Sequence, residues 1–105
     1  MKIAVTYQDG DIFQHFGHTE FFKIYDIENT DIVKTEIVST NGSGHGALAQ
    51  FLHEHSVDTL ICGGIGGGAQ MALSQAGIKL YGGVTGKADA AVNALLNNKL
   101  NYDPA

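Results

Sequence analysis

The sequence predicts an α/β fold in three layers, with helices on both faces of a five-stranded mixed sheet. Residues 2–39 fall into segments that alternate apolar and polar side chains, as strands with one covered face do. After Asn41-Gly42-Ser43-Gly44 the apolar spacing changes to that of helices. The run over residues 57–62 is short and continuously apolar, which is typical of a buried parallel strand.

Three strands are expected before residue 40. β-Branched and aromatic residues open the chain, and the turn signal Asp9-Gly10 ends the first strand. A loop follows over residues 11–18. The second and third strands are joined by the short turn Asn29-Thr30, so we expect them to form a hairpin. The three strands cover residues 2–7, 20–28 and 32–39.

Helices and buried strands are expected to alternate in the rest of the chain. Residues 57–62 and 78–81 are the fourth and fifth strands. Gly77 is a stop signal for the second helix, and Thr85-Gly86 can cap the third. The apolar residues with helical spacing are Leu48, Phe51 and Leu52 in the first helix, Ala69, Ala72, Leu73 and Ala76 in the second, and Ala88, Ala91, Val92 and Leu95 in the third.

The order of these elements predicts the topology. Two hairpins followed by two right-handed crossovers place the first strand at the centre of the sheet. The expected strand order is 3-2-1-4-5, with strand 2 alone antiparallel. Residues 1–100 are predicted to form a single domain, and residues 101–105 a frayed C-terminal tail.

Composition excludes several classes of protein. The chain has 105 residues and a formal charge of −5, which disfavours nucleic-acid binding. Its single cysteine, Cys62, excludes an intrachain disulfide and a zinc or iron–sulfur site held by four thiolates of the chain itself. No apolar run is long enough to cross a membrane and no cleavable signal region opens the chain, so we expect a cytoplasmic protein.

A ligand site is expected at the carboxyl ends of the parallel strands, where open α/β sheets gather their ligands. The N-termini of all three predicted helices point to this edge, with unpaired N–H groups and a partial positive charge. We therefore expect the edge to favour an anion, although the chain as a whole is acidic. Most of the 14 glycines fall in the four segments that meet there: residues 8–18, 40–44, 63–67 and 82–86.

The glycine-rich loop matches a dinucleotide-binding pattern only in part. Residues 64–69 fit G-x-G-x-x-A between a strand and a helix. The next strand ends Tyr81-Gly82-Gly83, however, with no acid to bind a ribose, and this disfavours a dinucleotide. The loop is no P-loop either, because no Gly-Lys-Ser/Thr follows it.

Histidines form a second candidate site. His15 and His18 lie three residues apart in His15-Phe16-Gly17-His18, and His45 falls on the same expected edge. Imidazoles suit iron, zinc, copper and nickel. The alternative is that these are surface or capping histidines, and for Cys62 that it is a small buried hydrophobe.

Catalysis finds little support in the sequence. No Ser-His-Asp arrangement is suggested by the spacing, and the first strand, Ile3-Ala4-Val5, lacks the acids of a two-metal nuclease. We therefore predict a protein that is not an enzyme.

Several motifs resemble the dinitrogenase iron–molybdenum cofactor biosynthesis family, which includes NifX-like proteins and the C-terminal domain of NifB-like proteins. They occur in the family's order over about residues 1–100. The motifs are His15-Phe16-Gly17-His18, Phe21-Phe22-Lys23-Ile24-Tyr25-Asp26, Cys62-Gly63-Gly64-Ile65-Gly66-Gly67-Gly68-Ala69, Ala76-Gly77-Ile78, and Gly83 with Gly86.

The resemblance implies a ribonuclease H-like motif and a carrier that binds iron–molybdenum cofactor, or an iron–sulfur precursor, without turnover. Cluster donor and acceptor proteins would then be its partners. A second hypothesis is a small module that binds a phosphate-bearing metabolite through residues 63–68. For the carrier, the resemblance implies His15, His18 and His45 as ligands, helped by Cys62, with a backbone cradle at Gly64, Gly66 and Gly67.

Overall fold

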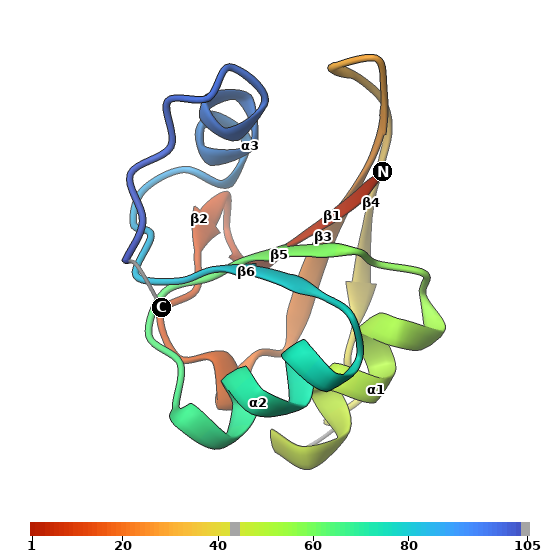
Figure 1. Ribbon diagram of the computed structural model, residues 1–105, viewed down its shortest axis with the longest axis vertical. Helices are drawn as coiled ribbons and strands as arrows, with labels where there is room; N and C mark the ends of the chain where they lie inside the picture. The colour runs from red at the N-terminus through yellow and green to blue at the C-terminus, as the bar shows by residue number, and fades with distance from the viewer. Residues whose placement is uncertain (43–44, 104–105) are drawn as a thin grey trace.

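The computed structural model describes residues 1–42 and 45–103, with residues 45 and 46 described by their backbone alone. Strands come first along the chain and helices alternate with strands afterwards (Figure 1). The elements are β1 (Lys2–Gln8), β2 (Asp11–Ile12), the 3-10 helix η1 (Phe16–His18), β3 (Phe21–Glu28), β4 (Asp31–Ser39), α1 (His45–Glu54), β5 (Thr59–Ile61), α2 (Gly67–Gln75), β6 (Lys79–Tyr81) and α3 (Ala88–Leu96).

The sheet is mixed and has six strands. Its main path runs β4-β3-β1-β5-β6, and β2 pairs with β1. β3 is antiparallel to both of its neighbours, whereas β5 and β6 continue the direction of β1. The predicted mixed α/β class is confirmed, and the predicted number of five strands is wrong because β2 adds a sixth.

The additional strand arises from the turn at Asp9-Gly10. Both residues have positive φ angles, 51° and 90°, which is the geometry of a tight hairpin turn. The chain folds back so that Tyr7 pairs with Ile12. The Ile12 N–H then donates to the Gly86 carbonyl over 2.9 Å, which ties the hairpin to the start of α3. This segment, predicted as a loop, therefore anchors one end of the sheet.

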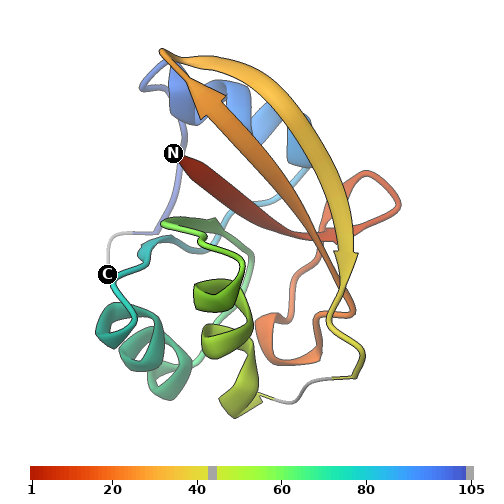
Figure 2. The same ribbon diagram turned by 90° about the vertical axis from the view of Figure 1, so that its right-hand side faces the viewer.

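Helices cover the two faces of the sheet, α1 and α2 on one and α3 on the other (Figures 1 and 2). Because side chains alternate along β1, its Ala4 belongs to the core under α1 and α2, while its Ile3 and Val5 belong to the core under α3. The three layers that the sequence predicts are thus present. None of the helices within residues 1–42 and 45–103 has the length and apolar character needed to span a membrane.

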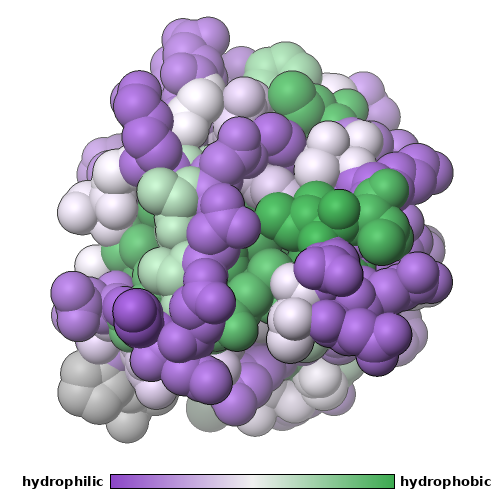
Figure 3. Space-filling view, turned by 90° about the horizontal axis from the view of Figure 1, so that it is seen from above, coloured by the Kyte–Doolittle hydropathy of each residue, from purple (hydrophilic) through white to green (hydrophobic). Residues whose placement is uncertain are grey.

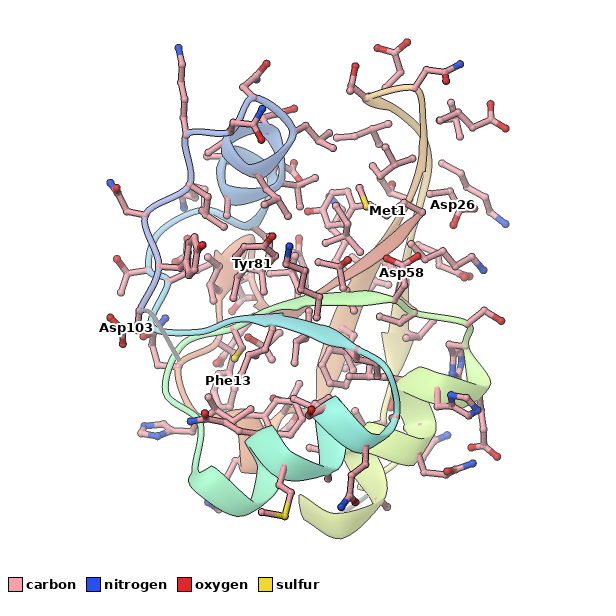
Figure 4. All side chains as sticks on the ribbon, in the orientation of Figure 1. Met1, Phe13, Asp26, Asp58, Tyr81 and Asp103 are labelled. Carbon is pink, nitrogen blue, oxygen red and sulfur yellow. The ribbon has the colours of Figure 1, made fainter. Side chains whose placement is uncertain are left out.

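The end of the chain packs on the sheet. The ring of Tyr102 contacts that of Tyr81 edge-on, with centroids 4.6 Å apart. The Asp103 N–H donates to the Gly82 carbonyl over 2.8 Å, and Asp103 lies beside the segment that follows Tyr81 (Figure 4). The sequence predicts that residues 101–105 fray, whereas Tyr102 and Asp103 make these contacts. Residues 104–105 are outside the described part.

Candidate functional site

The histidine loop and the glycine loop are joined by backbone pairing. Gly64, which follows β5, donates its N–H to the Gln14 carbonyl over 2.7 Å. Its own carbonyl accepts the Phe16 N–H at 3.1 Å, so His15 and Gly64 form a parallel bridge. Segments that are about 50 residues apart in the sequence are thereby held side by side.

A buried phenylalanine positions the two imidazoles. Phe16 is 2% exposed, and its carbonyl accepts hydrogen bonds from the N–H and the hydroxyl of Thr19. The His18 N–H donates to the His15 carbonyl over 2.9 Å, which closes the turn of η1. The rings of His15 and His18 consequently lie edge to face, with centroids 6.5 Å apart.

A hollow of about 540 Å³ lies between this turn and the beginning of α2. Its size is in the range of small-molecule and cofactor sites, roughly 300–1,000 Å³. Among the described residues, the wall combines imidazoles, glycine backbone and apolar side chains, without a carboxylate or an ammonium group. It is formed by His15, Phe16, Gly17, His18, Gly64, Ile65, Gly66, Gly68, Ala69 and Ala72.

The N-terminus of α2 is open toward this hollow. Gly66 is the N-cap and offers no side chain to cap the helix, and the first turn has no acidic residue. The first N–H groups of a helix have no partner within it, and they carry a partial positive charge. A Cβ built on Gly66, Gly67 or Gly68 would meet no atom within 4 Å. The backbone here is accessible to an anionic ligand.

The structure brings some of the predicted residues together and separates others. His15, His18 and Gly66 line the hollow, and Gly67 is the first residue of α2. Gly64 lines it too, but its N–H and carbonyl are both engaged in the bridge, so its role is to join the loops. His45 is the first residue of α1, and its side chain is outside the described part.

Cys62 is not brought to the hollow. It belongs to the core beneath α1 and α2 and is fully buried. Burial raises the pKa of the Cys62 thiol to about 12, so the sulfur stays protonated at neutral pH. The structure therefore places this residue among the small buried hydrophobes, which was the alternative interpretation of the sequence.

The N-termini of α2 and α3 lie on different faces of the sheet. The first turn of α2 lines the hollow. The first N–H of α3, at Ala88, donates to the Gly10 carbonyl over 3.0 Å on the other face of the sheet. α1 begins directly after residues 43–44, which are outside the described part. Among the described helix starts, the anion-binding character expected of this edge is thus found at α2.

Two residues that line the hollow were predicted from the sequence as core residues. Ala69 and Ala72 were predicted as the core stripe of the second helix, and both also line the hollow. Their small size leaves this side of the hollow open. Among the described side chains, no three His, Cys, Asp or Glu groups converge as a metal site. Two imidazoles beside a helix N-terminus can offer nitrogen ligands to a metal and N–H groups to an anion.

Comparison with known proteins identifies the family. The family described as dinitrogenase iron-molybdenum cofactor matches residues 1–98. The chain belongs to this family. The NifX-like resemblance of its motifs is therefore confirmed.

Relatives of known sequence or structure cover nearly the whole chain. An uncharacterised protein of Methanocaldococcus jannaschii, MJ0580, is 31% identical over 95% of this chain and 89% of its own length. The crystal structure of PH0822 is 29% identical, with a TM-score of 0.92 over 98% of this chain and 95% of that one. The apo form of the orange protein from Desulfovibrio gigas is 27% identical, with a TM-score of 0.82 over 97% and 92% of the two chains.

Proposed function

We propose that this family member is a non-enzymatic carrier of a preformed metal–sulfur cluster, either iron–molybdenum cofactor or an iron–sulfur precursor. The observation that carries the proposal is the His15–Gly64 bridge, which sets two imidazoles beside the open N-terminus of α2. The cluster is cargo, received from a donor protein and passed to an acceptor protein.

Two kinds of contact would hold such a cluster. Metal–sulfur clusters of this type are anionic, and the N–H groups of Gly67, Gly68 and Ala69 are oriented to stabilise negative charge. His15 and His18 supply nitrogen ligands to an exposed metal atom, with His45 as the third candidate. Gly66 and Gly67 let the cluster approach the backbone. Few side-chain ligands favour release, which a carrier requires.

Family membership and chemistry support the same proposal. The family description names the iron–molybdenum cofactor of dinitrogenase, and the structure of the orange protein is that of an apo form. The described residues of the hollow's wall include no carboxylate that would repel an anionic cluster. The fully buried Cys62 is left out of the ligand set that we propose.

Anaerobic titration of the purified protein with isolated iron–molybdenum cofactor, and separately with a synthetic iron–sulfur cluster, tests the proposal. We expect one cluster per chain, and we expect His15→Ala/His18→Ala/His45→Ala to weaken binding by at least about tenfold, which is about 1.4 kcal/mol. His53→Ala, on the exposed last turn of α1, is the matched control and should bind normally. Unchanged binding by the triple variant would refute this ligand set.

A phosphate-bearing metabolite is the second candidate ligand, and the uncapped start of α2 favours it specifically. Such a ligand would need the backbone of residues 66–69 and no metal. Under this alternative, inorganic phosphate or a nucleotide would raise the unfolding temperature of metal-free protein. The triple histidine variant would then keep the effect, which distinguishes the two candidates.

A further inference from the structure

β4 is the outermost strand of the sheet, and its outer side is unpaired in the described part of the chain. Figure 2 shows it along the rim of the molecule. It bears apolar side chains that remain in contact with solvent: Ile32 is 36%, Val33 54% and Ile37 53% exposed. Apolar residues also reach the surface between hydrophilic margins on the face that carries α3 and the tip of the hairpin (Figure 3). A long apolar edge of this kind is a template for pairing with another strand.

The charged side chains on β4 favour pairing with β4 of a second copy of the chain. Lys34 and Glu36 flank Thr35, and neither side chain has a hydrogen bond or ion pair within residues 1–42 and 45–103. In an antiparallel pairing with a second copy, centred on Thr35, each Lys34 lies opposite Glu36 of the other copy. Opposite charges that face each other across strands are stabilising. The strand is therefore complementary to itself.

Only this central register gives that complementarity. Centring the pairing on Lys34 would place lysine opposite lysine, and centring it on Glu36 would place glutamate opposite glutamate. Intermediate registers would pair residues from opposite faces of the sheet, which a continuous sheet does not allow. The order of the charges thus selects one register.

The apolar residues continue the match on either side. The register between β3 and β4 shifts after Asp26, so that Asp26 faces Lys34 while Ile27 faces Ile32. This bulge leaves Val33 as the extra residue of β4. In the dimer, Val33 of one copy would lie opposite Ile37 of the other, and Ile32 opposite Val38. The two-fold symmetry would cover this exposed apolar surface on both copies.

We propose that two copies of this protein associate through β4 in a two-fold symmetric dimer with a continuous antiparallel sheet. None of the residues that line the hollow beside α2 belongs to β4. Both copies therefore keep an accessible cluster site. The inference is independent of the proposed function, because it uses no residue of that site.

Charge exchange tests the dimer. Sedimentation equilibrium should show a dimer for the unaltered protein. Lys34→Glu or Glu36→Lys alone should raise the dimer dissociation constant by about tenfold or more, because each variant replaces two attractive charge pairs by two repulsive ones. An equimolar mixture of the two single variants should form a heterodimer, and Lys34→Glu/Glu36→Lys in one chain should restore the homodimer. Lys99→Glu and Glu54→Lys, exposed and outside β4, are controls that should dimerise normally.

Circular dichroism verifies that each variant is folded. A monomeric unaltered protein at high micromolar concentration would overturn the proposal. A dimer that persists in both single variants would overturn it equally, because it would then use another surface.

Discussion

Glycine has two distinct roles beside the hollow. A Cβ on Gly63 would lie 2.7 Å from the Cα of Gln14, and one on Gly64 would lie 3.1 Å from the Gln14 carbonyl oxygen, so the packing of the two loops requires small residues there. Gly66, Gly67 and Gly68 have open space around them and no positive φ angle. The fold does not require glycine at these three positions, whereas the close approach of the proposed ligand to the backbone would.

Substitution of the open glycines should therefore separate stability from binding. We expect Gly67→Ala/Gly68→Ala to leave the free energy of unfolding unchanged or to raise it by up to about 1 kcal/mol per site, because alanine favours the helix. The same variant should bind the cluster more weakly, because its methyl groups occupy the space that the ligand needs. Urea unfolding and anaerobic titration measure the two effects.

The control for this variant is Ser74→Ala, exposed and later in α2. It should favour the helix in the same way without affecting binding. Normal cluster binding by the double glycine variant would show that the start of α2 is not the contact surface.

Among the elements, α3 is attached to the sheet by a polar cluster. The Asp89 carboxylate of α3 accepts hydrogen bonds from the Lys23 ammonium at 2.8 Å and from the Tyr25 hydroxyl at 2.5 Å, both from β3. Lys23, and then Tyr25, lower the pKa of the Asp89 carboxyl below its ordinary value. Burial, and then Asp89, raise the pKa of Tyr25. The interactions among Lys23, Tyr25 and Asp89 are thus most favourable when Asp89 is charged and Tyr25 is protonated.

These shifts predict how stability depends on pH. Because the pKa of Asp89 is lowered in the folded state, its contribution to the free energy of unfolding is present above the ordinary aspartate pKa of about 3.9 and is lost as the pH falls below it. Because the pKa of Tyr25 is raised, its contribution is present below about pH 10 and is lost as the pH rises beyond that. In urea unfolding, Asp89→Asn should be less stable at neutral pH and should lose less stability on acidification than the unaltered protein. If the free energy of unfolding fell equally for both proteins as the pH is lowered, this role of Asp89 would be contradicted.

Most elements could be predicted from the sequence, including the short buried strands β5 and β6, but the two-residue strand β2 could not. Apolar spacing identified β3, β4 and the three helices because each is long enough to show a period. β2 has two residues, too few for an alternation, and it depends on pairing with β1. The expected strand order places β4 at the edge of the sheet, but the apolar spacing of Ile32 and Ile37 does not show that both side chains are left exposed there.

The residues that line the hollow were predictable where they belong to local motifs. His15, His18 and Gly66 lie within short motifs, and the structure places them around one hollow. The burial of Cys62 follows from which face of the sheet the end of β5 presents, and the engagement of Gly64 follows from a contact with a distant loop. Both depend on tertiary packing that the sequence does not display.

On the scale of the whole molecule, the C-terminal segment closes one end of the sheet. Tyr102 packs on Tyr81, and Asp103 lies against Gly83, whose φ is +69° and where a Cβ would collide with the Asp103 carboxylate. The last described residues therefore stabilise the segment that follows β6.

Removing the tyrosine contact should weaken this closure. We expect Tyr102→Ala to lower the free energy of unfolding by about 1 kcal/mol, the order of an aromatic pair at a partly exposed position. Asn101→Ala, exposed and adjacent, should have little effect. Urea unfolding of the two variants gives the comparison, and equal stabilities would show that the end of the chain packs without contributing.

The central claim is that a metal–sulfur cluster binds between η1 and the start of α2, and nuclear magnetic resonance tests it most directly. Amide spectra of ¹⁵N-labelled protein would be recorded anaerobically before and after addition of a paramagnetic iron–sulfur cluster. We predict that the signals of residues 15–18 and 64–69 broaden first, while those of Asn29 and Thr30, at the far tip of the β3–β4 hairpin (Figure 1), keep their intensity. Broadening centred on any other surface, or no broadening at all, would contradict the claim.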